Sequence, residues 1–407
     1  MTTQVLHGDS LEVLQGFPDC SFQSLVTDPP AGIKFMGKKW DHHKGGRDKW
    51  IAWLENIMVE ALRVLVPGAY GVVWAIPRTS HWTATALENA GFEIRDVITH
   101  INAQGFPKSV DVTKELLEAG AVHAAEDWIG WGTALKPASE HWILVRKPLI
   151  GTIVENILTC GAGAINVGGC AVGDEERVNQ AAGNLGGTAS LHMGVRGMPQ
   201  DASAKETVGR WPPNVVFTHD ERCNEMASGR VLCHPECPTQ ELPSREVGGT
   251  AVGPRECFPA FVFESKAGRG EKDGGLDEWA VLSGGGATGR KDGSAGTKSP
   301  RAGAGRTGGS RNHHPTVKAV DLMRWFVRLV TPSHGRVLDV FCGSGSTGCA
   351  CAMEDLSFTG VDIDETNVKL ARDRIAFWMA QRGLSAEEAK RLDAIGKKRK
   401  GEQLKLV

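Results

Sequence analysis

The sequence predicts an α/β protein built on a doubly wound, mostly parallel sheet with an inserted, irregular domain. Three observations lead to this fold class. Short apolar runs alternate with segments of helical periodicity, which indicates parallel strands with helices on both faces. A glycine-rich turn follows the apolar strand at 336–340, as in sheets that bind a ligand at their strand ends. The chain between about 151 and 312 is polar and lacks a regular period.

The first part of the sheet comes from residues 1–150. An apolar strand at 24–27 precedes a helix at 50–66, which we expect to end at Pro67-Gly68. A strand at 71–76, a helix at 82–89 and a strand after Gly91 follow. Five tryptophans have apolar neighbours in the sequence and are expected in the core: Trp74, Trp82, Trp128, Trp131 and Trp142.

Regular periodicity returns at His313. We expect helices at 317–330, 347–353 and 365–379, and strands at 336–340 and 358–361. The middle of the chain holds two strand-like pieces, 214–217 and 261–263. It ends in a segment, 267–311, with 14 glycines in 45 residues, whose part 284–311 carries a net charge of +5. Such a composition buries little apolar surface, so we expect a linker.

Composition bounds the functional class. The 407 residues include 51 glycines without a three-residue period, and 41% are apolar, which excludes collagen and wholesale disorder. The net charge of -2 means that any contact with nucleic acid must come from local basic patches. The sequence has no evident signal peptide and no run of 18 apolar residues, so we expect a cytoplasmic protein with reduced cysteines and no membrane contact.

The turn at 341–348 has the features of a cofactor loop. Gly343 and Gly345 allow a sharp turn and close approach of a ligand, and Asp362, 19 residues after Gly343, can accept hydrogen bonds from ribose hydroxyls. The letters Gly-x-Gly-x-x-Gly also fit a dinucleotide site, and a purely structural turn is a further alternative. Only about 60 residues follow the loop, which is short for the rest of an NAD-binding fold.

A second motif, Asp28-Pro29-Pro30, directly follows the strand at 24–27. The two prolines stiffen the turn and remove two N–H donors, which leaves the Asp28 carboxylate and the Pro29 carbonyl as acceptors. Two rigid acceptors suit an exocyclic amino group, which has two N–H donors. Asp-Pro is also a common turn initiator, so a structural turn is the alternative interpretation.

Together these motifs resemble those of permuted, β-class amino DNA methyltransferases of the N6-adenine type, including phage and prophage members of restriction-modification-like systems. The resemblance rests on five segments in order, with weaker likeness at 105–109 and 132–137: residues 8–14, 28–30, 314–318, 339–348 and 360–362. It implies a Rossmann-like fold, S-adenosylmethionine as cofactor, and double-stranded DNA with a flipped base as substrate. It leaves open whether the chain is a monomer or a homodimer.

The resemblance also assigns roles. Asp28, Pro29 and Pro30 would be catalytic. The cofactor would be held by Asp9, Ser10, Asp339, Phe341, Gly343, Gly345, Thr347 and Asp362. The catalytic domain would comprise residues 1–150 and 313–385, the target-recognition insert 151–312, and a charged tail 386–407.

One position departs from the family. Ala31 stands where an aromatic residue usually stacks on the flipped base, and Phe35 or Trp40 on the same loop are candidates to replace it. With the permuted motif order, the resemblance implies adenine N6 as the methyl acceptor, because Asp stands at position 28. N4-cytosine methylation, a non-catalytic DNA-binding relative and an NAD-dependent oxidoreductase are the alternatives.

The insert contains a candidate zinc site. His219, Cys223, Cys233 and Cys237 have spacings that a tetrahedral structural zinc ion accepts, and a metal would organise a segment with few apolar residues. Free thiols are the alternative.

Overall fold

The computed structural model describes residues 2–34, 39–102, 109–179, 205–218, 223–225, 231–232, 245–247, 250–252, 260–261, 269–282 and 309–382. The candidate residues Phe35, His219, Cys233 and Cys237 lie outside these ranges, as do residues 283–308 of the glycine-rich segment and the charged tail. No helix in the described part of the chain is long and apolar enough to cross a membrane.

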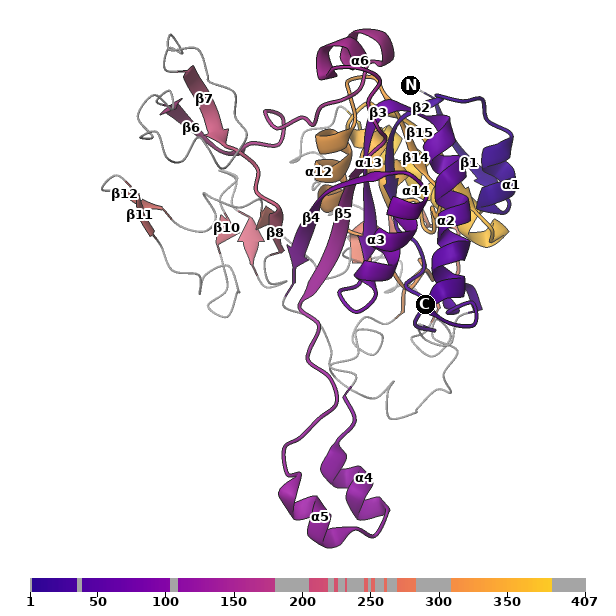
Figure 1. The fold of residues 1–407 in the computed structure, drawn as a ribbon, viewed down its shortest axis with the longest axis vertical. Helices are drawn as coiled ribbons and strands as arrows, with labels where there is room; N and C mark the ends of the chain where they lie inside the picture. Colours follow the sequence, from indigo (N-terminus) through magenta and orange to yellow (C-terminus); the bar gives the residue numbers. More distant parts are fainter. Residues whose placement is uncertain are drawn as a thin grey trace, which may run out of the picture.

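A nine-stranded sheet forms the centre of the molecule, in the order β1-β15-β14-β2-β3-β5-β4-β8-β13 (Figure 1). All neighbouring strands pair in parallel except β5, which is antiparallel to β3 and β4. The strands are β1 (Thr3–His7), β2 (Phe22–Thr27), β3 (Leu65–Ala75), β4 (Glu93–Ile101), β5 (Ser139–Arg146), β8 (Val215–Thr218), β13 (Ala260–Phe261), β14 (Arg336–Asp339) and β15 (Ser357–Asp362).

Helices cover both faces of this sheet. One face carries α1 (Ser10–Gln15), α2 (Arg47–Val64) and α3 (Ser80–Asn89), which pack on Leu25 and Val73. The other carries α12 (Val320–Val330), α13 (Ser346–Met353) and α14 (Glu365–Ala380), which pack on Val26 and Val72. Successive strand residues point to opposite faces, so adjacent residues enter two separate cores. This confirms the expected doubly wound, mostly parallel α/β fold.

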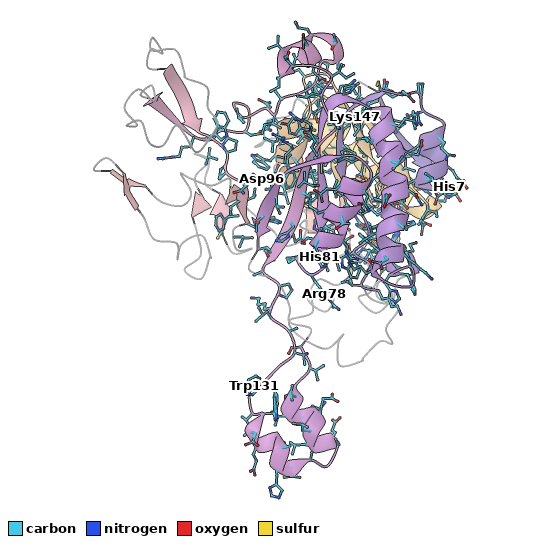
Figure 2. All side chains as sticks on the ribbon, in the orientation of Figure 1. His7, Arg78, His81, Asp96, Trp131 and Lys147 are labelled. Atoms are coloured by element: carbon cyan, nitrogen blue, oxygen red, sulfur yellow. The ribbon has the colours of Figure 1, made fainter. Side chains whose placement is uncertain are left out.

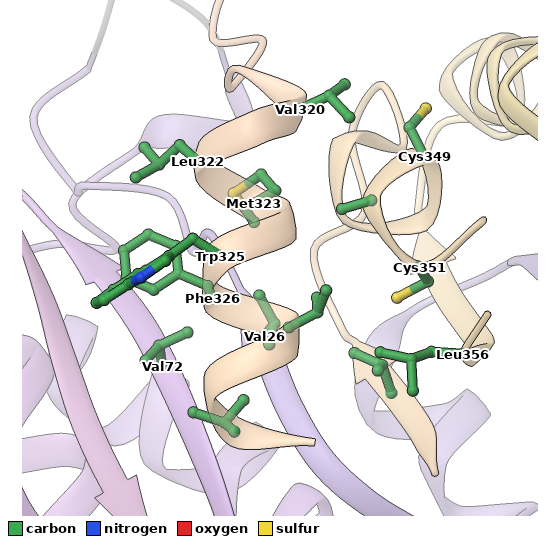
Figure 3. Packing of buried hydrophobic residues seen from close by; sticks show 14 of the residues in the cluster. Val26, Val72, Val320, Leu322, Met323, Trp325, Phe326, Cys349, Cys351 and Leu356 are labelled. Atoms are coloured by element: carbon green, nitrogen blue, oxygen red, sulfur yellow. The ribbon is translucent and has the colours of Figure 1, made fainter. Parts of the chain in front are cut away.

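The core under α12 shows why that helix forms. Its apolar residues recur at helical spacing, so that Val320, Met323 and Phe326 are buried in one cluster between the sheet and α13 (Figure 3). Cys349 and Cys351 of α13 lie fully buried in the same cluster. This packing fixes the start of α12 close to the strand ends.

Smaller elements lie outside the central layers. They are the 3-10 turn η2 (Lys39–Asp41), helices α4 (Val112–Glu118), α5 (Val122–Asp127), α6 (Ile153–Cys160) and α8 (Arg269–Asp273), and the strand pairs β6 (Val172–Asn179) with β7 (Lys205–Arg210), β9 (Asn224–Glu225) with β10 (Val231–Leu232), and β11 (Arg245–Val247) with β12 (Thr250–Val252). The boundaries of the insert stay a prediction, although β8 and β13, both within 151–312, extend the central sheet.

Two expectations were wrong. The helix expected at 50–66 ends at Val64, and β3 begins at Leu65 and runs through Pro67-Gly68, where its pairing with β2 is irregular. Trp128 and Trp131 are not core residues. They are 43% and 60% exposed in the α4–α5 arm, which projects from the body (Figures 1 and 2). Two helices of seven and six residues offer too little surface to cover them.

Candidate active site

The candidate catalytic and cofactor residues meet at one edge of the sheet, because parallel strands end on the same side. Asp28 follows β2, the turn at 341–345 follows β14, and Asp362 ends β15. The strand order β1-β15-β14-β2 places these ends next to one another. Asp9 and Ser10 follow β1 at the outer end of this row.

Asp339, at the end of β14, ties the two motifs together. It is 3% exposed, and its carboxylate accepts hydrogen bonds from the Thr27 hydroxyl at 2.7 Å and the Thr347 hydroxyl at 2.6 Å. The backbone N–H of Phe341 donates to the same carboxylate at 3.2 Å. Burial raises the pKa of Asp339 to about 6, although the hydroxyl hydrogen bonds oppose the rise. Asp339 therefore fixes the glycine turn beside the residue that precedes Asp28.

The glycine turn is shaped by close contacts on both sides. Gly343 and Gly345 have φ values of 51° and 76°, in the left-handed region that favours glycine. A side chain at Gly343 would meet the ring of His314 at 2.9 Å, and one at Gly345 would meet Ala371 at 2.8 Å. The N–H of Gly343 donates to Asp362 at 2.8 Å, which joins the turn to the end of β15.

Other residues predicted to bind the cofactor lie at the same edge of the sheet. Asp9 caps α1 by accepting from the Leu11 N–H at 2.9 Å, and Ser10 donates to the Val340 carbonyl at 2.6 Å. Burial raises the pKa of Asp362, whose carboxylate also accepts from the Asn367 amide at 3.1 Å. The residues predicted for cofactor binding thus lie along three adjacent strand ends.

Asp28 lies in a charged cluster formed with Lys318 and Glu140. The Lys318 ammonium lies 3.4 Å from Asp28 Oδ2 and 3.6 Å from Glu140 Oε2. Burial raises the pKa of Asp28 to about 7, Lys318 lowers it, and the negative charges of Glu140 and Asp339 raise it. Burial would also raise the pKa of Glu140, but Lys318, His100 and the Trp74 N–H hold it well below its usual range.

Several of these residues were missed by sequence reasoning. Lys318 was recognised only as part of a matching segment, and Glu140 and His100 carried no local signal because the strand pairing of β4 and β5 brings them together. Arg374 of α14 was also missed. Its fully buried guanidinium donates to the Ser344 carbonyl at 2.6 Å and to the Ser344 hydroxyl at 3.1 Å, and so holds the glycine turn from behind.

The loop after Pro30 is tied to its surroundings by polar contacts. The Gly32 N–H donates to Asp41 at 2.7 Å, and the Thr79 hydroxyl donates to the Ala31 carbonyl at 3.2 Å. Trp40 is 36% exposed, and its ring is nearly parallel to that of His314, with 6.3 Å between the centroids. Burial, with positive neighbours, lowers the pKa of His314 to about 3.

A cavity of about 420 Å³ adjoins this loop. It is lined by Gly32, Ile33, Lys34, His43, Gly46, Arg78, Thr79 and Trp82. Lys34 and Arg78 are exposed at its wall, and Arg78 lies at the lower end of the body (Figure 2). Desolvation, together with His43 and the nearby charges of Lys34 and Lys44, lowers the pKa of the neighbouring His42.

The zinc site is not assembled by the part of the chain that the structure describes. Of its four candidate ligands only Cys223 is described, and it is buried. No group of three or more metal-ligating side chains occurs among the described residues.

Part of the chain is similar to known proteins. Residues 288–373 match the family model described as DNA methylase. The type II methyltransferase M.HindIII of Haemophilus influenzae is 26% identical over 117 residues, which cover 28% of this chain and 38% of that protein. The matched part therefore spans well under half of the relative's length.

Three solved structures align with most of the chain at low sequence identity and with TM-scores below 0.5. A putative DNA modification methylase from Thermus thermophilus is 14% identical with a TM-score of 0.42, covering 92% of this chain and 95% of that chain. The M1.HpyAVI–SAM complex is 16% identical with a TM-score of 0.41, covering 92% and 99%. PvuII DNA methyltransferase, which is cytosine-N4-specific, is 13% identical with a TM-score of 0.44, covering 97% and 93%. Over the segment that carries the glycine turn and Lys318, the chain is similar to DNA methylases.

Proposed function

We propose that this protein transfers a methyl group from S-adenosylmethionine to the exocyclic N6 of an adenine flipped out of double-stranded DNA. One observation carries the proposal: the Asp28-Pro29-Pro30 turn and the glycine turn follow neighbouring strands, β2 and β14. The hydrogen bond from Thr27 to Asp339 joins them directly. A group bound at the glycine turn would therefore lie beside the Asp28 carboxylate.

The residues present fit S-adenosylmethionine. Asp362, at the end of β15, and Asp9, which follows β1, offer carboxylate acceptors for ribose hydroxyls and the adenine amino group on one side of the Gly343–Gly345 turn. Ser10, Asp339, Phe341 and Thr347 complete this edge, with Asp339 acting through the turn that it holds. When bound, the cofactor supplies a methyl group on a positively charged sulfur. The match to the DNA methylase family model includes the turn and Asp362.

Asp28 would bind and orient the substrate. Its carboxylate and the Pro29 carbonyl would each accept one N–H of the amino group, which directs the nitrogen lone pair at the methyl carbon. As the new N–C bond forms and the C–S bond breaks, the nitrogen becomes positively charged and Asp28 stabilises it. Asp28 then takes the proton that the nitrogen releases, a role that suits a carboxyl group with a pKa of about 7.

The surroundings of the turn favour DNA as the partner. The cavity beside Gly32 presents Lys34 and Arg78, which can neutralise backbone phosphates next to a flipped nucleotide. Trp40, exposed on the same loop, is our candidate for stacking on the base in place of the missing aromatic residue at Ala31. These positive side chains give the surface beside the turn a local charge opposite in sign to the net charge of -2 of the whole chain.

N4-cytosine methylation is the second candidate, because cytosine offers an exocyclic amino group of the same kind. One of the similar solved structures is a cytosine-N4-specific enzyme. We favour adenine because Asp occupies position 28.

The test is transfer of labelled methyl groups to unmethylated DNA, followed by digestion to nucleosides and mass spectrometry. We expect N6-methyladenine with the wild type and none with Asp28→Ala. Equal incorporation by the two proteins would refute the role of Asp28. N4-methylcytosine would move the substrate to cytosine, and labelling of RNA or protein without DNA would refute the substrate class.

A further inference from the structure

Lys318 occupies a fixed position between two carboxylates. It lies two residues before α12, and its side chain is 12% exposed. The ammonium reaches the end of β2 at Asp28 and the start of β5 at Glu140. Packing of α12 on the sheet therefore sets where this charge lies.

Two tryptophan rings hold the ammonium in place. Lys318 Nζ lies 3.9 Å from the ring centroid of Trp74 and 5.7 Å from that of Trp142. Both rings are buried, and a cation over an aromatic face is attracted by its negative quadrupole. The lysine has thus lost its side-chain freedom in the folded state, and no further ordering is needed when a substrate binds.

Glu140 prevents Lys318 from binding tightly to Asp28 alone. Trp74 Nε1 donates to Glu140 Oε2 at 3.1 Å, and His100 Nδ1 lies 3.7 Å from the same oxygen. The two N–O distances of Lys318, 3.4 and 3.6 Å, are longer than the ~2.8 Å of a tight charged hydrogen bond. Because the ammonium is shared and approaches Oδ2, the Oδ1 oxygen of Asp28 is, among the residues that the structure describes, available to a substrate N–H.

We infer that Lys318 is a positioning residue of the candidate active site: held by Glu140 and two tryptophans, it favours the ionised form of Asp28 and directs its carboxylate at the substrate amino group. The inference rests on the proposed function. Lys318 touches neither the amino group nor the methyl group in this arrangement. It acts through Asp28, and Glu140 acts through Lys318.

Substitution of Lys318 and substitution of Glu140 should shift the pKa of Asp28 in opposite directions. The charged groups that face Asp28 are Lys318, Glu140 and Asp339. Without the ammonium, Asp28 is still buried and still faces two negatively charged neighbours. Both influences raise its pKa, which we expect to lie above 7. Removal of the Glu140 charge takes away a negative neighbour, so the pKa of Asp28 falls. A merely structural role for either residue would not produce opposite shifts.

The first measurement is a ¹³C NMR titration of protein labelled at aspartate carboxyl carbons, with Asp28→Asn used to assign the Asp28 signal. We expect a midpoint near 7 in the wild type, a higher one in Lys318→Met and a lower one in Glu140→Gln. Lys318→Arg, which keeps the charge, should titrate near the wild type. Lys369→Met is the matched control, since Lys369 also lies over a tryptophan ring, 5.5 Å from Trp279, and is exposed.

The second measurement is the pH profile of single-turnover methyl transfer. Transfer needs the Asp28 carboxylate, so the rate rises with pH through its pKa. A rise of one unit in Lys318→Met would lower the rate about tenfold on the acid side and leave the high-pH plateau less affected. Glu140→Gln should move the acid limb the other way.

Different results would refute the role of Lys318 and the proposed function. An Asp28 midpoint that Lys318→Met and Glu140→Gln leave unchanged, or move in the same direction, overturns the inference even if DNA is methylated. If no methyl transfer occurs with any substrate while the midpoints shift oppositely, the charge coupling stands and the proposed function falls.

Discussion

Two carboxylates, Asp28 and Asp339, end neighbouring strands of the same sheet and are held in different ways. Asp339 is almost fully buried and accepts hydrogen bonds from two hydroxyls and one backbone N–H. Among the described residues, Asp28 pairs with Lys318, whose ammonium lies 3.4 Å from the Oδ2 oxygen of Asp28. The acceptor positions of Asp339 are thus occupied within the fold, whereas Asp28 keeps acceptor positions that a substrate N–H can fill.

The largest predicted effect is on the free energy of unfolding, and it tests whether Asp339 stabilises the fold while Asp28 does not. Asp339→Ala would leave the Thr27 and Thr347 hydroxyls and the Phe341 N–H without their acceptor, and we expect a loss of about 3 kcal/mol in the free energy of unfolding. Asp28→Asn should leave this free energy equal or higher at pH 8, because it removes a buried charge. Urea unfolding followed by circular dichroism measures both. A tolerated Asp339→Ala would contradict the structural role.

A smaller predicted effect concerns the region beside Asp28 and is measured as the salt dependence of DNA binding. If the cavity that follows the Asp28 turn contacts phosphates, Lys34→Gln with Arg78→Gln should reduce the slope of log affinity against log salt by about two in duplex DNA. The matched control is Arg95→Gln with Lys114→Gln, which changes two exposed basic residues on β4 and α4. The same slope in all three proteins would place the DNA elsewhere.

Much of the candidate site was predictable from the sequence. The β2 and β14 strands and the helices that follow them were recognised because apolar periodicity and glycine turns are local features. The Asp28 and Gly343 turns could be expected at one edge, since carboxyl ends of parallel strands meet there.

The rest depends on tertiary contacts. Lys318 and Glu140 are 178 positions apart, and their meeting follows from how α12 packs on β3 and β5. Trp128 and Trp131 have the local composition of core residues, but the chain between β4 and β5 leaves the body, which no periodicity reveals. The role of Asp339 as the anchor of two hydroxyls was equally hidden, because Thr27 lies on a strand far away in sequence.

The most direct test of the account is the single-turnover rate of methyl transfer to saturating duplex DNA at pH 8 in Asp28→Asn. The isosteric amide keeps the shape of the turn but removes the charge that would stabilise the amino nitrogen, so we expect a loss of about a hundredfold or more with cofactor binding unchanged. Asp19→Asn, an exposed aspartate paired with Arg63, should retain the wild-type rate. A wild-type rate in Asp28→Asn would contradict the central claim.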